Sequence, residues 1–424
     1  MCEINKYTTK INNLLRSFEY KLNIPQEHDF INKLKKIYNE LDISMSNLSN
    51  IKSIEIKKKH NYNEKTFLQE CCEEVYGLKK LSIKDFYKWY REHHTKINLY
   101  HDMKHTSEIK NKKMHDKMFS DNPLHKLLYE NTFISYDVVH HAESEDLIYE
   151  HLKEEKIEIH AFLPKIARKI KYELIIEIIY FMSKLAQVDN FNLELYIFCG
   201  KQKKYMTEFC NIITPENINS GLSVKHQYIV IWREEELYKV LIHELVHFFG
   251  IDFYLNDDIY KDIKKIFVEK FNINGDDKIN ESYTEALALT INSFIYSQKY
   301  NCTFREVFMK EMLFSSFQVA KILNNCNTNE ITNISDIHIT QTTSAFSYFV
   351  IKWLFLMNIG RLLVFWDKSI FVKNNKNEYK KLYQNIINND HINLDIINNM
   401  IKFIKHQKCN KFIYKTMRMS VHDY

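Results

Sequence analysis

One stretch of this 424-residue chain is compatible with very few kinds of structure, namely residues 240–249. All its side chains are apolar except those of His243, Glu244 and His247. A run with so few polar positions is typical of a helix that is covered on most sides. We therefore expect a buried helix here, packed against a sheet.

Sequence signals at both ends set the limits of this helix. Residues 228–232 are β-branched, aromatic or aliphatic, as in a strand, and the acidic residues at 234–236 suit the first turn of a helix. Gly250 is suited to the position that ends a helix. These signals predict a helix over about 234–249, directly after a strand.

His243 and His247 are four residues apart, so on a helix their imidazoles lie on one face, close enough to bind one metal ion. Glu244 then lies beside the metal, where it can accept a proton from an activated water and return it to a leaving amine. A metal also gives this buried carboxylate a partner. The motif predicts one catalytic Zn²⁺ per chain. His101 and His105 have the same spacing but polar flanks, and we interpret them as a surface pair.

A catalytic zinc needs a third protein ligand, and two placements compete. One is Glu285, in a downstream segment with helical spacing, and the other is Asp252, just after the end of the motif helix. Glu281 lies one turn before Glu285 and faces the same way. It is able to exchange roles with Glu285 or to support a ligand histidine.

This arrangement resembles the gluzincin class of metallopeptidases, in which a glutamate in an Asn-Glu-Ala-like context on a second helix completes the zinc site. Residues 284–286, Thr-Glu-Ala, match that context in part, so the resemblance assigns Glu285 as the third ligand. Thermolysin-like members have an aspartate four residues later that orients a histidine, and here that residue is Leu289. The metzincin pattern instead requires histidine or aspartate at Phe253, which leaves Asp252 as a helix-end or supporting acid.

A narrower resemblance covers more of the chain. It is to a largely uncharacterised family of metallopeptidases encoded by giant nucleocytoplasmic DNA viruses, and the similar segments are 218–221, 229–247, 249–253, 281–285 and 343–348. Tyr348 lies in the last segment and is our first candidate for the donor that stabilises the oxyanion, with His338 as the second. Residues 228–232 are expected to be the edge strand that aligns a peptide substrate.

Apolar periodicity divides the chain into three regions. Residues 1–145 have helical spacing at 11–22 and 67–89, and 301–424 return to it, which predicts helical N- and C-terminal regions. In 146–300, residues 157–159 and 193–198 alternate like strands around a helical segment at 172–185. We therefore predict a mostly helical α+β protein, with a zincin-like core that has a small mixed sheet and a cleft completed by the C-terminal region.

Composition limits the expected partners and location. The 59 basic and 54 acidic residues give a net charge of +5 without long runs of one sign, so we expect no nucleic-acid partner. Eight cysteines without a C-x-x-C pair are typical of a reduced, cytoplasmic protein, here in a host cytoplasm or virion. No signal peptide is expected, because Glu3 comes early and no apolar run follows it. The most apolar stretch, 348–366, contains Lys352 and Arg361, which predicts a buried helix rather than a membrane span.

The function expected from these features is that of a zinc metallopeptidase acting on a peptide or protein substrate. Two alternatives stay open. One is a catalytically inactive, zincin-like binding or structural protein with a blocked water position, although an intact Glu244 argues against it. The other is a helical scaffold in which the motif arises by chance. Nothing in the sequence selects an oligomeric state.

Overall fold

The computed structural model describes residues 13–16, 18, 24, 28–47, 147–164, 170–200, 203–206, 212–252, 257–271, 278–370, 376–388, 394–406 and 411–424. The predictions for 67–89, for His101 and His105, and for most of 11–22 lie outside these residues. So does Phe253.

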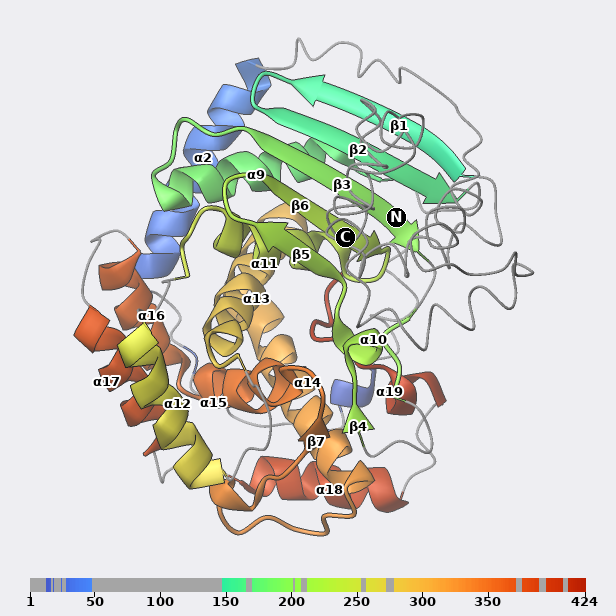
Figure 1. Cartoon of the computed structure of the whole chain (residues 1–424), viewed down its shortest axis with the longest axis vertical. Coiled ribbons are helices and arrows are strands. Elements are labelled where there is room, and N and C mark those ends of the chain that lie inside the picture. Colours follow the sequence, from blue (N-terminus) through green and yellow to red (C-terminus); the bar gives the residue numbers. More distant parts are fainter. Residues whose placement is uncertain are drawn as a thin grey trace, which may run out of the picture.

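A five-stranded mixed sheet forms the upper part of the molecule in Figure 1. Its strands are β1 (Leu147–Glu154), β2 (Ile157–Pro164), β3 (Leu193–Gly200), β5 (Gly221–Val224) and β6 (Tyr228–Arg233). The order is β1-β2-β3-β6-β5, so β1 and β5 are the edges. β2, β3 and β6 run parallel, while β1 and β5 pair antiparallel with their neighbours.

The three strand segments predicted from the sequence lie in β2, β3 and β6, whereas β1 and β5 were not predicted, and the prediction of the edge strand was wrong. β6, which contains the predicted edge strand, is paired on both sides and is buried along its length. The edge is the short strand β5, which returns through a turn at His226, where φ is 57°. The apolar composition of β6 reflects this interior position, because a central strand is covered on both faces.

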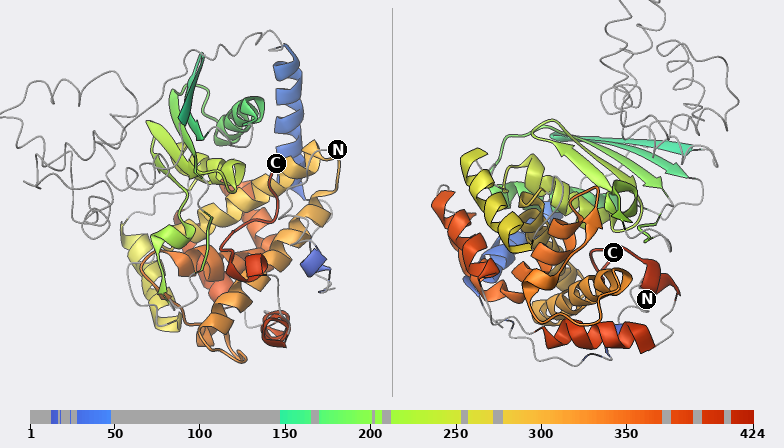
Figure 2. Two further views of the ribbon diagram at one scale, coloured as in Figure 1. Left: turned by 90° about the vertical axis from the view of Figure 1, so that its right-hand side faces the viewer. Right: turned by 60° about the horizontal axis from the view of Figure 1, so that its bottom comes forward.

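The remaining elements are mostly helices, and Figure 2 shows most of them gathered beneath the sheet. Two helices, α2 (Asp29–Asn47) and α9 (Tyr172–Ala186), lie beside the sheet in Figure 1. The others are α10 (Pro215–Ile218), α11 (Leu237–Phe248), α12 (Asp257–Phe271), α13 (Asn280–Lys299), α14 (Phe304–Asn325), α15 (Lys352–Met357), α16 (Ile359–Ser369), α17 (Lys376–Ile387), α18 (Asp395–His406) and α19 (Lys411–Lys415). Shorter pieces are η2 (Ile334–Asp336), the π-helix η3 (Phe346–Ile351), and the pair β4 (Ile212–Ile213) and β7 (Thr340–Gln341).

This architecture confirms the predicted class, a mostly helical α+β fold with a small mixed sheet. The buried core takes residues from all three predicted regions, for example Leu34, Leu195 and Trp353. The division into three domains stays a prediction.

The apolar stretch at 348–366 is buried, as predicted, but it is not one helix. It breaks at Asn358, and the helical segments on either side are bent by 92°. Trp353, Leu362 and Trp366 are fully buried. Within the described ranges no single helix is long and apolar enough to cross a membrane, and this bent pair meets that requirement only when its two halves are counted together.

The motif helix α11 begins at Leu237, three residues later than predicted, and Glu235 and Glu236 before it bind Lys204 instead. Glu236 has a φ of 61° and accepts hydrogen bonds from the backbone N–H groups of Met419 and Ser420. Its second oxygen accepts from Lys204 Nζ at 2.8 Å. The buried C-terminal segment 416–424 therefore fixes the start of α11. Its end is as predicted, at Gly250 with a φ of 64°.

Candidate metal centre

His243 and His247 lie one turn apart on the buried helix α11. Their Nε2 atoms are 3.2 Å from each other. Glu281, in the first turn of α13, directs Oε2 at the same point, 3.3 Å from His243 Nε2 and 3.4 Å from His247 Nε2. Helix α13 packs directly against α11, so two helices bring three donor atoms together.

The spacing of these three atoms fits a tetrahedral metal. When zinc has bonds of 2.0–2.1 Å to nitrogen and oxygen, two of its ligand atoms lie about 3.3 Å apart. The observed distances of 3.2, 3.3 and 3.4 Å match that separation between ligand atoms. Two imidazoles and one carboxylate are also a donor set that zinc accepts. The residues present therefore fit one zinc ion.

Glu285, the ligand predicted from the sequence, occupies a different position. Its Oε2 lies 2.9 Å from His243 Nδ1, the ring nitrogen that faces away from the three-atom group, and its Oε1 accepts a hydrogen bond from Lys239. The structure thus groups Glu281, not Glu285, with the two Nε2 atoms. The reason is that α13 begins at Asn280, which places Glu281 level with both histidines and Glu285 one turn deeper.

A signal for this arrangement was present in the sequence. Asn280 directly precedes Glu281, which gives the Asn-Glu pair of the gluzincin context, whereas the residue before Glu285 is a threonine. With Glu281 in the ligand position, the residue four places later is Glu285 and not Leu289. Glu285 is also an acid that contacts a histidine. The leucine at position 289 is therefore no evidence that an acid orienting a ligand histidine is missing.

His247 has a carboxylate partner of its own. Asp252, just beyond the end of α11, lies against His247 Nδ1 and also accepts a hydrogen bond from Thr284 Oγ1 at 3.4 Å. This is the supporting place expected for Asp252. Both histidines therefore have Nδ1 on a carboxylate and Nε2 on a common point. Such contacts fix the ring orientation and the tautomer that leaves Nε2 for a metal.

Burial alone would raise the pKa of Glu281, but His247 and His243 outweigh it and hold that pKa well below its ordinary value. Burial likewise opposes the charged form of His247, yet Glu281 and Asp252 raise its pKa well above the ordinary value. For Glu285, Lys239 and His243 overcome burial and lower the pKa. Glu281 and Glu285 are therefore ionised at neutral pH and favour a cation.

Glu244 is buried between α11 and the edge strand β5. A Cβ atom at Gly221 of β5 would come within 2.8 Å of Glu244 Oε1, so the glycine leaves room for this carboxylate. Burial is the largest influence on Glu244 and raises its pKa, although His243 and His247 oppose the shift. Glu244 is thus close to the histidines but is not one of the three converging donors.

Tyr348 reaches the centre from the π-helix η3. Its hydroxyl donates a hydrogen bond to Glu281 Oε2 at 3.2 Å, and its ring centroid lies 6.1 Å from that of His243. π-helical turns of this kind are often found at functional sites. His338, the second candidate for the same role, is exposed to solvent, unlike the buried residues of the centre.

Comparison with known proteins gives one distant relative. An uncharacterized protein of Acanthamoeba polyphaga mimivirus is 28% identical to this chain over 193 residues, which are 42% of this chain and 48% of that protein. The chain thus spans about half the length of the relative it matches. It matches no described protein family and no solved structure. The comparisons connect the chain to a viral protein without a named function and leave the metal centre as the evidence for what it does.

Proposed function

We propose that this protein is a zinc-dependent metallopeptidase, with His243, His247 and Glu281 as ligands and Glu244 as general base. The observation that carries the proposal is the set of three donor distances, which matches the ligand spacing of tetrahedral zinc. A catalytic zinc has three protein ligands and an open fourth position, and among the described residues three donors converge here.

Bound zinc would supply a Lewis acid that lowers the pKa of a water and polarises the carbonyl of the substrate. Glu244 would accept the proton of that water and return it to the leaving amine. Its buried position beside the histidines and its raised pKa suit a group that takes up and releases a proton. Tyr348, one hydrogen bond from Glu281, would donate to the oxygen on which negative charge develops.

A peptide substrate is favoured by the strand next to Glu244. β5 is an edge of the sheet, with β6 as its partner and no other described strand on its outer side. An extended peptide is able to pair with such an edge through main-chain hydrogen bonds. Because Gly221 of β5 abuts Glu244, the paired peptide would pass close to the general base.

The test is the zinc content of purified wild type beside His243→Ala, Glu281→Ala, Glu285→Gln and Glu244→Gln. We expect about one zinc per chain to be lost when His243 or Glu281 is replaced, since each is a ligand. Glu244→Gln should keep that zinc. Glu285→Gln should keep it at saturating zinc but bind it about 10- to 100-fold more weakly, as for a residue that orients a ligand.

The same variants, screened with a peptide library, separate an enzyme from a binding protein. Wild type should cleave peptides, and Glu244→Gln should retain zinc but lose cleavage. Zinc binding without any cleavage would favour the inactive zincin-like alternative. Zinc content that does not change in His243→Ala or Glu281→Ala would refute the metal centre and favour the helical scaffold.

A further inference from the structure

A second group of metal-binding side chains lies on the opposite part of the sheet from the motif helix. It consists of His151 on β1 with Glu158 and His160 on β2. Helix α11 packs against β5 and β6, at the other end of the strand order. The two groups are therefore separate sites.

The alternation of β1 places these side chains on the face of the sheet away from α9. Glu150 and Glu154 of β1 accept hydrogen bonds from Tyr172 and Tyr180 of α9. His151 is one residue from Glu150 and three from Glu154, and because successive side chains of a strand alternate, it points to the other face. His160 is its direct cross-strand partner, and Glu158 is two residues from His160, so all three share that face.

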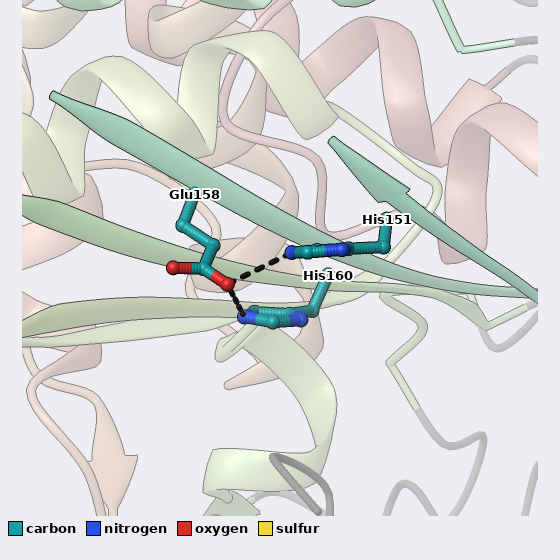
Figure 3. A group of neighbouring side chains, drawn as sticks. All are labelled: His151, Glu158 and His160. Carbon is teal, nitrogen blue, oxygen red and sulfur yellow. Dashed lines mark hydrogen bonds and ion pairs between the residues drawn. The ribbon is translucent and has the colours of Figure 1, made fainter. Parts of the chain in front are cut away.

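Strand register also brings the donor atoms together. The rings of His151 and His160 are stacked, with centroids 4.9 Å apart and planes at 11°. Both rings direct Nε2 toward Glu158, whose Oε1 lies 2.8 Å from His151 Nε2 and 3.7 Å from His160 Nε2, as Figure 3 shows. These separations bracket the about 3.3 Å between ligands of a tetrahedral zinc.

The surroundings support a preformed and accessible site. Tyr196 of β3 stacks on the other side of His160, at 4.9 Å and 18°, and its hydroxyl is anchored on Glu194 at 2.9 Å. His160 is thus held between two rings. The side chains of His151 and Glu158 are 23% and 30% exposed, which leaves a path for an ion and for water as a further ligand. Although burial opposes it, contacts with His151, His160 and Lys153 lower the pKa of Glu158.

We propose that His151, His160 and Glu158 form a second binding site for a divalent transition metal ion of the zinc class. Two imidazoles and a carboxylate on adjacent strands are a donor set for such an ion, with water completing the coordination. β1 is an edge strand whose partner among the described strands is β2, so the ion would clip this edge to the sheet. The site would therefore stabilise the fold, independently of the proposed catalytic zinc.

Zinc content by elemental analysis, after equilibration with zinc, tests this proposal in wild type, His160→Phe, Lys153→Gln and His243→Ala. Phenylalanine keeps the stack with Tyr196 but removes the donor atom. Lys153 is the matched control, because it lies on the same face and contacts Glu158 at 3.4 Å but is not one of the three donors. We expect about two zinc ions in wild type and Lys153→Gln, and about one in His160→Phe and in His243→Ala.

The outcomes separate the two sites. Zinc content in His160→Phe equal to that of wild type would overturn the second site. If His160→Phe loses zinc and His243→Ala does not, the second site stands and the proposed catalytic centre fails. Both sites are supported if His160→Phe and His243→Ala each lose one zinc ion and the double variant His160→Phe/His243→Ala loses both.

A second measurement tests the site without His160→Phe, in case that variant does not fold. In the His243→Ala background, added zinc should raise the midpoint of thermal unfolding, and Glu158→Gln, which keeps the side-chain shape, should weaken zinc binding about tenfold or more. A zinc-dependent shift of the same size with Glu158→Gln would contradict the proposal. With a chelator present, the unfolding curves of His243→Ala and of His243→Ala/Glu158→Gln should be similar.

Discussion

His243 and His247 each lie between two carboxylates, and this explains how two histidines are oriented in a buried helix. His243 has Glu281 on one nitrogen and Glu285 on the other, and His247 has Glu281 and Asp252. Rotation of either ring would break these contacts and leave a buried carboxylate with one partner fewer. The penalty for that burial holds both rings in the orientation that a shared metal ion requires.

At the residue scale, Gly221→Ala tests the position of Glu244, the proposed general base. The new Cβ would lie 2.8 Å from both Glu244 Oε1 and Val240 Cγ1, so the Glu244 carboxylate must move. We expect peptide cleavage to fall by about 100-fold, as for a catalytic group displaced by about an ångström. Zinc content should stay unchanged, because Glu244 is not one of the proposed ligands.

Gly360→Ala is the matched control for this substitution. A Cβ at Gly360 meets nothing within 4 Å, and the residue lies within α16. Alanine there should raise the free energy of unfolding by about 0.5–1 kcal/mol and leave cleavage unchanged. If Gly221→Ala cleaves peptides as fast as Gly360→Ala does, Glu244 does not need its observed position.

At the scale of elements, the centre is built where two helices match each other turn by turn. Lys239, His243 and His247 follow one face of α11, and Glu281 and Glu285 follow the facing side of α13. Each glutamate thus meets residues from successive turns of α11: Glu285 contacts Lys239 and His243, and Glu281 contacts both histidines. A shift of either helix along its axis would break the whole set of contacts.

Lys239→Met tests this pairing. Lys239 and Glu285 are both buried, so removal of the cation leaves Glu285 with one partner fewer. We expect the free energy of unfolding to fall by about 3–5 kcal/mol, as when one partner of a buried ion pair is removed. Zinc affinity, measured by competition with a chelator, should fall about 10- to 100-fold because His243 is held less firmly.

The double variant Lys239→Met/Glu285→Gln distinguishes this interaction from general damage. A neutral glutamine no longer needs a cation and still has an oxygen to accept from His243 Nδ1. In chemical denaturation, the double variant should therefore be destabilised by clearly less than the sum of the two single variants. Additive losses would mean that the two side chains do not act as a pair.

At the scale of the whole molecule, the buried segment 416–424 joins the centre to the helical body. Its backbone N–H groups are bound by Glu236 before α11 and by Glu311 of α14. Its Thr416 carbonyl accepts from Lys321 Nζ, also on α14. Residues nearly two hundred positions apart in sequence thereby fix where the motif helix begins.

The pH dependence of Lys321→Met tests how this segment is held. Burial lowers the pKa of Lys321 from 10.5 to about 7. Between these two pH values the unfolded chain binds more protons than the folded one. Below pH 7 the buried Lys321 is charged in the folded protein, and the cost of burying that charge lowers stability by its full amount. This cost shrinks as the pH rises and disappears near pH 10.5. The gain in unfolding free energy from Lys321→Met should therefore be larger at pH 6 than at pH 9, by roughly 3 kcal/mol.

The substitution leaves the Thr416 carbonyl with a second donor, Gln318 Nε2 at 3.3 Å, so no buried acceptor is left unpaired. Lys402→Met, at an exposed lysine of α18, is the control and should show the same small effect at both pH values. Urea denaturation at the two pH values provides the measurement. An equal gain at pH 6 and pH 9 for Lys321→Met would show that Lys321 is not charged at a cost in the folded protein.

The sequence by itself determined the local features. Apolar periodicity predicted the helix with His243, Glu244 and His247, three of the strands and the mostly helical α+β class, and Gly250 marked the stop of the helix. These features depend on residues close together in the chain, and their spacing is read directly from the sequence. The carboxylates near the metal centre were also among the candidates.

Only the tertiary structure decided how distant segments meet. It placed Glu281 rather than Glu285 at the shared point, made β5 rather than β6 the edge, and set the start of α11 through Glu236 and the C-terminal segment. It also brought His151 opposite His160. The physical reason is that periodicity gives the face of a helix or strand on which a residue lies, whereas the axial offset of two packed helices and the register of two strands depend on the packing of the whole core.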